Sequence, residues 1–472
     1  MSALTAFEGK KYPAKEHAQR VHTHYSQQQS SARAAFFISG ELLELYQYSD
    51  QTRPWRQNRY FFYLSGCDIP SCHVLYVPET DRLTLFLPDF DVDDVMWSGL
   101  PLSREKALLK YDVDDVKYAA DLEATLKEMH GKVGTVLTTE INKWNAVVAR
   151  FLTEKDDAFF LALDECRMIK DAYEIALMKH AAHITDNCHL AVMSAVPIET
   201  NETHIHAEFI YHALRQKAKH LLYDPICCAG PNCSTLHYVK NDDDIGATKR
   251  SVLIDAGAEW SCYASDVTRC FPINGDWTKE HLEIYNIVLK MQKLAMAMIR
   301  PGALWDAIHL ETHRVLIREF VKLGIFKDCG EDTIFELNIS VGFFPHGLGH
   351  LLGMDTHDVG GRPNYEDPDP KLRYLRLRRP LQAGMVLTDE PGVYFSPFLL
   401  KEILKDPKKL QYINTEVLDK YYYVGGVRIE DDLLITEAGF ENFTKITSDP
   451  EEISKIMRAA MQKGRSSFQN VF

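Results

Sequence analysis

Apolar and polar residues follow two different periods in the first third of the chain. Short apolar, β-rich runs bounded by turn residues predict strands, and patterns with a 3.6-residue period predict helices. The expected strands are residues 34–39, 61–65, 73–77, 82–87 and 133–138, and the expected helices are residues 102–110 and 121–129. This alternation predicts a self-contained α/β domain over residues 1–164.

The acidic segment DFDVDDVMWSG, residues 89–99, interrupts this pattern. Its charges and its single tryptophan, Trp97, indicate a loop rather than a helix or strand. A solvated acidic turn anchored by one tryptophan is the simplest interpretation.

The pattern changes near Asp164, where a long amphipathic helix is expected to begin. A second domain of mixed α+β type is therefore placed at residues 165–472. Its expected elements are a helix at 204–219, an irregular segment at 223–237, strands at 251–257 and 261–273, and helices at 279–299 and 305–323.

Composition narrows the function classes. The chain has 472 residues, of which 46% are hydrophobic and 25% charged, as in ordinary globular proteins. Its net charge of −14 argues against nucleic-acid binding, because phosphate recognition needs clustered Lys and Arg. The start of the sequence lacks the apolar core of a signal peptide, and no run approaches the length of a membrane span. We therefore expect a cytoplasmic protein with reduced thiols and a small or peptidic partner.

The stretch FFPHGLGHLLGMDTHD, residues 343–358, has neither the helical nor the strand period. It contains the histidines His346, His350 and His357 between glycines, which let a backbone approach a ligand closely. A single histidine in such a place is usually buried and hydrogen-bonded. Three of them become a binding site only if acidic partners exist elsewhere in the chain.

Such acidic partners occur in strand-like contexts. If the strands around residues 251–257 and 261–273 pair as a hairpin, Asp255 and Asp266 can face each other, with Cβ atoms about 4.5–5.5 Å apart. Facing carboxylates repel unless one is protonated or a cation lies between them. Glu390 and Glu430 add two more, and Arg428 shares a strand face with Glu430, where it can orient the carboxylates. Four carboxylates and a hydroxide are balanced better by two divalent ions than by one.

Together the motifs HGLGH, LGMDTHD, DAGAEW, SDVTR, TDEPG and GGVRIED resemble those of the pita-bread metallopeptidases, in the branch of aminopeptidase P and prolidase. The resemblance covers nearly the whole chain and is strongest to fungal Xaa-Pro aminopeptidases. It implies a creatinase-like N-terminal domain and a catalytic domain with a curved antiparallel sheet. It also implies two manganese ions, held by Asp255, Asp266, His350, Glu390 and Glu430.

The same resemblance implies a role for each site residue. Asp255 would chelate one ion, Asp266 and Glu430 would bridge both, and a bridging hydroxide would be the nucleophile. Glu390 would also relay a proton. The remaining roles concern the substrate: His346 faces it, His357 donates to the oxyanion, and His237 lies over the scissile peptide and the prolyl group.

Three further expectations come from prolidase-like relatives. Arg376 would grip the free carboxylate of a dipeptide, and the chain would form a homodimer in which Trp97 reaches the partner's active site. Asp389 departs from the family pattern, because relatives more often carry an apolar or small residue there. Its side chain should point away from the metals, and if buried it needs a cation or a raised pKa.

Several alternatives stay open at this point. The protein could be a strict Xaa-Pro dipeptidase, a non-catalytic pita-bread binding module, or a metal-free hydrolase of the creatinase type. The complete set of five ligand candidates favours a peptidase acting on proline-containing peptides. An oxygen-rich site with one imidazole suits manganese, but the ligand types also allow zinc or cobalt.

Overall fold

The computed structural model describes residues 3–29, 33–93, 95–140, 146–154 and 156–463. Packing divides the chain into two compact units, Met1–Tyr173 and Glu174–Phe472. The division lies in the first turn of helix α8 (Ala172–Ala195), compared with the expected boundary after residue 164. Among the described residues, no helix combines the length and apolarity that a membrane span requires.

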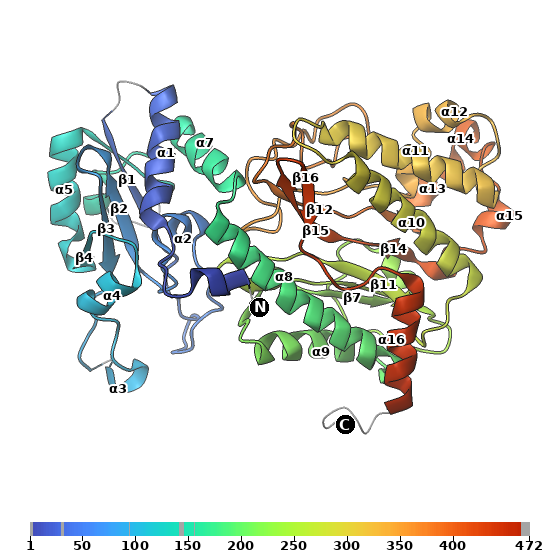
Figure 1. The fold of residues 1–472 in the computed structure, drawn as a ribbon, viewed down its shortest axis with the longest axis horizontal. Coiled ribbons are helices and arrows are strands. Elements are labelled where there is room, and N and C mark those ends of the chain that lie inside the picture. The colour runs from blue at the N-terminus through green and yellow to red at the C-terminus, as the bar shows by residue number, and fades with distance from the viewer. Residues whose placement is uncertain (1–2, 30–32, 94, 141–145, 155, 464–472) are drawn as a thin grey trace. The chain divides into compact units, whose positions relative to one another are not determined.

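The N-terminal unit is built on a five-stranded mixed sheet in the order β4–β3–β2–β1–β5 (Figure 1). Its strands are β1 (Ala34–Ser39), β2 (His73–Val77), β3 (Arg82–Leu87), β4 (Asp115–Tyr118) and β5 (Thr135–Leu137). Its helices are α1 (Ala14–Gln28), α2 (Arg59–Ser65), α3 (Val95–Ser98), α4 (Arg104–Lys110), α5 (Leu122–Val133), α6 (Ala146–Ala149) and α7 (Asp157–Met168). The alternating α/β pattern expected from the sequence is therefore confirmed.

Helices cover both faces of this sheet, which explains why the central strands β1 and β2 are buried at every position. Phe37 of β1 and Leu126 of α5 belong to one core cluster. The next residue towards the N-terminus, Phe36, points to the opposite face, where its ring lies 5.5 Å from that of Tyr25 in α1 and 4.7 Å from that of Phe159 in α7.

Three expectations for this unit are wrong. Residues 95–98 of the acidic segment form the short helix α3 rather than a loop, and Trp97 is exposed rather than anchored. Residues 61–65 lie in helix α2 instead of a strand, because Asn58 caps the helix by accepting from Phe61 N and Gly66 ends it with φ of 62°. The single long helix expected from Asp164 is two helices, α7 and α8. They are separated where Asp171 accepts a hydrogen bond from the backbone N–H of Tyr173.

The C-terminal unit contains short antiparallel strands and long helices. Its strands are β6 (His220–Leu221), β7 (Ile226–Ala229), β8 (Ser251–Asp255), β9 (Ala258–Trp260), β10 (Tyr263–Ala264), β11 (Thr268–Pro272), β12 (Val386–Asp389), β13 (Gly392–Tyr394), β14 (Gly426–Arg428), β15 (Asp431–Thr436) and β16 (Gly439–Asn442). Its further helices are α9 (Glu202–Arg215), α10 (Lys279–Met298), α11 (Trp305–Leu323), α12 (Glu331–Glu336), α13 (Pro397–Lys405), α14 (Pro407–Leu410), α15 (Thr415–Leu418) and α16 (Pro450–Lys463).

These strands form antiparallel sheets in the orders β11–β8–β7, β12–β15–β16, β13–β14 and β10–β9–β6. The helices back them and fix their ends. In α8, His189 Nε2 lies 3.1 Å from Ala256 O, just past the end of β8. In α10, Gln292 donates to the backbone oxygens of Asp389 and Ile429 at 3.3 and 3.4 Å. Both contacts hold the backbone beside the acidic residues that the sequence singled out.

The hairpin that carries two of these acids has a different register from the one expected. The strands β8 and β11 pair antiparallel, as predicted, but Asp255 faces Thr268 rather than Asp266. The chain makes a second, smaller hairpin, β9–β10, whose turn residues Ser261 and Cys262 have φ of 48° and 63°. This pairing continues the register of β8 and β11 to the tip, and the position of the turn at Ser261 and Cys262 places Thr268 opposite Asp255, so Asp266 lies just before β11.

Candidate active site

The C-terminal unit contains a cavity of about 630 Å³ into which every candidate from that half of the sequence is brought. Its lining includes the five metal-ligand candidates Asp255, Asp266, His350, Glu390 and Glu430, and the five further candidates His237, His346, His357, Arg376 and Arg428. Trp97 belongs to the N-terminal unit, where it lies in α3 and is 80% exposed.

The centre of the cavity has the donor atoms of a metal site. Asp266, His350 and Glu430 each offer a ligand atom, and these atoms lie within 4.8 Å of one another. His350 Nε2 is 3.5 Å from both Asp266 Oδ2 and Glu390 Oε1. Its other nitrogen, Nδ1, lies 2.9 Å from Leu351 O, which fixes the proton on Nδ1 and leaves Nε2 free to bind a metal.

Close backbone packing holds His350 against Glu390. Thr388 N donates to His350 O at 2.9 Å, and Glu390 N donates to Leu348 O at 2.8 Å, so the glycine-rich stretch runs beside the end of β12. A Cβ at Gly349 would lie 1.9 Å from Thr388 O. Glycine is therefore required here by the close approach of two backbones.

Charged and hydroxyl groups hold the carboxylates from outside. Arg428 Nη2 donates to Asp255 Oδ2 at 2.6 Å, and the hydroxyl of Tyr223 contacts both Asp255 and Asp266. Thr268 donates to Glu430 Oε2 at 2.6 Å and accepts from Arg428 Nε at 3.1 Å. The expected orienting role of Arg428 therefore falls on Asp255 directly and on Glu430 through Thr268.

The electrostatics of three of the four carboxylates call for cations, because burial raises the pKa of Asp255, Glu390 and Glu430, whereas, against the effect of burial, the hydrogen bond with His350 lowers that of Asp266. Burial, followed by repulsion from Asp266, raises the pKa of Glu430 well above its ordinary value. Burial also raises the pKa of Glu390 to about 7, although the charge of His350 opposes this. At neutral pH these acids resist full ionisation by themselves. Divalent cations at their centre would offset the repulsion, so the donor set fits a metal centre.

The two histidines beside the centre are held neutral. Burial and the charge of Arg428 lower the pKa of His346 to about 3, and burial and His350 lower that of His357 to about 3. His346 Nδ1 donates to Gly347 O at 2.7 Å and its Nε2 accepts from Tyr394 Oη at 2.9 Å. The single N–H of His346 is thus used within the protein, whereas a neutral His357 can donate one hydrogen bond to a substrate without adding charge.

Comparisons with known proteins agree with this geometry. The model of metallopeptidase family M24 matches residues 176–437, and that of the aminopeptidase P N-terminal domain matches residues 17–137. The chain belongs to metallopeptidase family M24. As a member it is a hydrolase of a metal-dependent peptidase family with the expected two-part architecture, an α/β N-terminal domain and a pita-bread domain with antiparallel sheets.

Relatives and solved structures support the same assignment to M24. An uncharacterized peptidase of Saccharomyces cerevisiae is 54% identical over 97% of this chain and 86% of its own length. A probable Xaa-Pro aminopeptidase of Sordaria macrospora is 45% identical over 97% of this chain and 98% of its own. Escherichia coli aminopeptidase P with the inhibitor Pro-Leu matches with a TM-score of 0.79 and 29% identity, covering 96% of this chain and all of that one.

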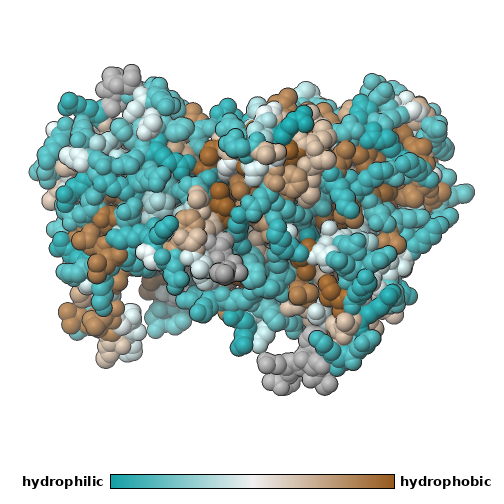
Figure 2. All heavy atoms as spheres, viewed as in Figure 1, coloured by the Kyte–Doolittle hydropathy of each residue, from teal (hydrophilic) through white to brown (hydrophobic). Residues whose placement is uncertain are grey.

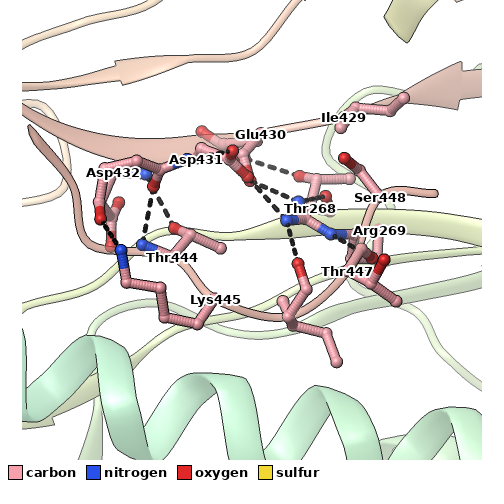
Figure 3. Close-up of polar contacts among 12 residues, drawn as sticks. Thr268, Arg269, Ile429, Glu430, Asp431, Asp432, Thr444, Lys445, Thr447 and Ser448 are labelled. Carbon is pink, nitrogen blue, oxygen red and sulfur yellow. Dashed lines mark hydrogen bonds and ion pairs between the residues drawn. The ribbon is translucent and has the colours of Figure 1, made fainter.

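Beneath the M24 site, a fully buried arginine holds the strand that carries Glu430 (Figure 3). Arg269 donates to the backbone oxygens of Glu430 at 2.8 Å, Thr268 at 2.9 Å and Ile446 at 2.7 Å. The same guanidinium forms an ion pair of 2.7 Å with Asp431. These contacts join β11, β15 and the segment after β16, so the arginine fixes the backbone on both sides of the site.

Four contacting residues of this M24 site were not singled out from the sequence: Tyr223, Thr268, Arg269 and Tyr394. Thr268 could have been found, because in an extended segment it shares a face with Asp266. No sequence pattern identifies Tyr223 and Tyr394 as site residues, apart from their positions near motifs. Arg269 stands in the quoted SDVTR motif, but its complete burial is a property of the folded sheets.

Asp389, the departure from the family pattern, is completely buried, and it is absent from the cavity lining among the described residues. Neither carboxyl oxygen has a hydrogen-bond partner in the described part of the chain. Burial, with the charges of Asp431 and Glu390, raises its pKa well above the ordinary value. We expected either a cationic partner or a raised pKa for a buried Asp389. The carboxyl group of Asp389 has the raised pKa.

Proposed function

We propose that the protein is a dinuclear manganese aminopeptidase that removes an N-terminal residue preceding proline, with Xaa-Pro dipeptides as good substrates. The observation that carries the proposal is the convergence of four carboxylates and His350 on one cavity, beside two neutral histidines. The names of the fungal relatives and of the E. coli neighbours support the Xaa-Pro class.

In this proposal, Asp255, Asp266, His350, Glu390 and Glu430 hold two divalent ions. Four carboxylate charges balance the four charges of the ions, and the oxygen-rich set suits manganese. One of the neighbours is a zinc-substituted E. coli aminopeptidase P, so zinc and cobalt are alternatives to test. When bound, such ions polarise a scissile carbonyl and lower the pKa of water.

The remaining chemistry is done by the chain's own groups. Glu390 takes a proton from the attacking water and returns it to the prolyl nitrogen, because its carboxyl group reaches into the cavity beside His346, 3.7 Å from Nδ1. His357, as a neutral donor, stabilises the oxyanion. His237 covers the prolyl group, and Arg428 keeps Asp255 in place.

A second candidate is a strict Xaa-Pro dipeptidase, and Arg376 favours it. Its guanidinium lines the cavity, and its Nη1 donates to Tyr365 Oη at 2.9 Å. A carboxylate held there would belong to a substrate that ends at proline. A non-catalytic binding module is less well supported, because all five ligand candidates are present and converge.

Two properties of the whole protein are part of the proposal. We infer a homodimer in which Trp97 reaches the partner's active site, supported by the exposure of this side chain. We also infer a cytoplasmic location, supported by ten free cysteines, which persist in reducing compartments.

Metal removal tests the proposed function. A chelator should abolish hydrolysis of Ala-Pro and Ala-Pro-Ala, and Mn²⁺ should restore it, because the carboxylates alone supply no Lewis acid. The variant Asp266→Asn, which removes a bridging charge, should stay inactive after Mn²⁺ addition and should bind less manganese in equilibrium dialysis. Full turnover by the metal-free protein would contradict the proposal.

A further inference from the structure

One wall of the cavity is an irregular loop, residues 230–245. It contributes Leu236, His237 and Val239 to the lining, yet its regular structure consists of the 3-10 turn Gly230–Ser234 and one β-bridge between Asp244 and Asn201. Backbone groups outside helices and sheets need other partners if they are buried. The position of His237 therefore depends on what holds this loop.

The main partner of the loop is a carboxylate that no catalytic role uses. Glu202 is the first residue of α9 and its side chain is completely buried. It accepts hydrogen bonds from Ala229 N at 2.9 Å, Asn232 Nδ2 at 3.0 Å, Tyr238 Oη at 2.8 Å and Asp243 N at 3.1 Å, and Lys249 Nζ lies 3.6 Å away.

The donors come from both sides of His237. Asn232 precedes it, Tyr238 follows it directly, and Asp243 lies near the end of the loop. The backbone repeats this arrangement, since Glu202 N donates to Asp243 O at 3.0 Å. One carboxylate thus accepts hydrogen bonds from several parts of the loop. Its burial is costly unless donors surround it, and hydrogen bonds to a charged acceptor are roughly twice as strong as neutral ones.

The imidazole of His237 has no comparable support of its own. Within the described residues, no hydrogen bond or ion pair to another side chain or to the backbone restrains its ring, which is exposed towards the cavity. The place of this ring is consequently set by the backbone of residues 236–238. That backbone is tied to Glu202 through the adjacent Tyr238.

We propose that Glu202 is a positioning residue, which sets His237 over the substrate through the loop that it gathers. The inference rests on the proposed function for the role of His237 itself. It adds a residue outside the cavity, on a different element, that controls how tightly the residue after the scissile bond is held. Tyr238 and Asn232 transmit the effect, because each donates to the same carboxylate.

A double-mutant cycle on the manganese-loaded full chain tests this, with kcat and KM for Ala-Pro-Ala. We expect His237→Ala to lower kcat/KM by about 100-fold in wild type and by less than about 3-fold in Glu202→Gln, because the loop no longer presents the ring. Glu202→Gln keeps the size but turns amide hydrogens towards donors, and should itself lower kcat/KM by about 30- to 100-fold, so that the double variant is no more active than His237→Ala. The control Glu208→Gln, on the same helix, should change neither value.

Hydrogen exchange gives a readout that does not depend on turnover. Amides of residues 229–245 should exchange faster in Glu202→Gln than in wild type or Glu208→Gln, since Ala229 N and Asp243 N bond to different carboxylate oxygens and the amide retains only one of them. Tyr238→Phe removes one donor and keeps the carboxylate. In this background, the effect of His237→Ala on kcat/KM should be about 3- to 10-fold smaller than in wild type. This variant serves as the test if Glu202→Gln fails to fold.

Different results would contradict the proposed function and the positioning role of Glu202. A wild type that does not hydrolyse Xaa-Pro peptides contradicts the proposed function. An active wild type in which the Glu202 and His237 losses multiply independently overturns the positioning role, as does unchanged exchange of residues 229–245. A coupled loss together with faster exchange establishes it.

Discussion

At the scale of single residues, the proposed function makes one guanidinium the test of substrate length. Arg376 lines the cavity, and a bidentate contact between a guanidinium and a carboxylate is among the stronger polar interactions. A substrate that continues beyond proline presents a neutral amide in place of that carboxylate. The charge at the end of the peptide should then determine whether the arginine contributes to binding.

We therefore expect Arg376→Ala to lower kcat/KM for Ala-Pro. The loss should correspond to about 2–4 kcal/mol of transition-state stabilisation, and the loss for Ala-Pro-Ala should be much smaller. Steady-state kinetics on both peptides measures the difference. Arg373→Ala is the matched control, because this arginine stands in the same segment but outside the cavity lining among the described residues. Equal losses on the two peptides, or a wild type that prefers the tripeptide, would favour a plain aminopeptidase.

At the scale of elements, the site depends on the glycine-rich stretch lying directly against β12. Gly349→Ala should destabilise the protein by about 1–3 kcal/mol, because the added Cβ meets the backbone oxygen of Thr388 and must push the two segments apart. Manganese affinity should fall as well, since His350 and Glu390 lie on the two separated segments.

Thermal unfolding and manganese titration measure these two effects. Gly131→Ala, inside α5 and with open space around its Cβ, is the control and should be neutral or slightly stabilising. If Gly349→Ala unfolds and binds metal like wild type, the close packing of the two backbones is not needed.

Some helices and strands could be predicted from the sequence and others could not. Strands β1, β2 and β3 and helices α10 and α11 were predictable, because long or β-rich apolar patterns leave little choice. Residues 61–65 were not, since a five-residue apolar run suits a buried strand as well as a helix, and the cap at Asn58 decides. The facing of Asp255 and Asp266 failed because the turn lies at Ser261 and Cys262, one residue later than that facing requires, which shifts the pairing by two residues.

The candidate site was better predicted than the packing around it. The five ligand candidates and three histidines came from motifs and from a family resemblance, and the fold brings them to one cavity. The residues that hold them, Arg269, Tyr223 and Glu202, depend on which segments meet in space. Their sequence neighbourhoods give no period or spacing that distinguishes them from ordinary surface residues.

At the scale of the whole molecule, stability should depend on pH through buried neutral histidines. Burial lowers the pKa of His281 in α10 to about 3, and in the described residues neither ring nitrogen has a hydrogen-bond partner. In the unfolded chain this histidine titrates near 6.5. Its contribution is complete above that pH and is lost progressively as the pH falls from about 6.5 towards about 3.

When the pH is lowered from 7.5 to 5, the free energy of unfolding should therefore fall less in His281→Phe than in wild type. The difference between the two losses should reach up to about 2 kcal/mol. The matched control is His130→Gln, on the exposed side of α5, which should follow the wild-type curve. Parallel curves for His281→Phe and wild type would show that this histidine does not contribute.

Assembly is the second property at this scale. Val92, Met96, Trp97 and Leu100 are 76–85% exposed, and Figure 2 shows apolar surface gathered over the end of the N-terminal unit that carries α3. Monomeric proteins rarely expose such patches without a partner. This exposure supports the proposed homodimer.

We expect light scattering to give a dimer, and Trp97→Ala to raise KM for Ala-Pro several-fold with little change in kcat. Tyr48→Ala, which removes a 97% exposed aromatic residue elsewhere in the same unit, is the control. A monomer with normal turnover excludes the dimer, and an unchanged KM in Trp97→Ala excludes the role of the tryptophan.

The candidate ligands are distributed from Asp255 to Glu430, and the bridges Thr268–Glu430 and Leu351–Leu387 form only when distant parts of the chain have met. During synthesis on a ribosome, the first two acids emerge long before Glu390 and Glu430 exist. A nascent chain therefore has no complete place for an ion until translation is nearly finished. With the proposed ligand set, we expect metal acquisition to be a late event in biogenesis, and a chain that ends before Glu430 should bind metal less tightly.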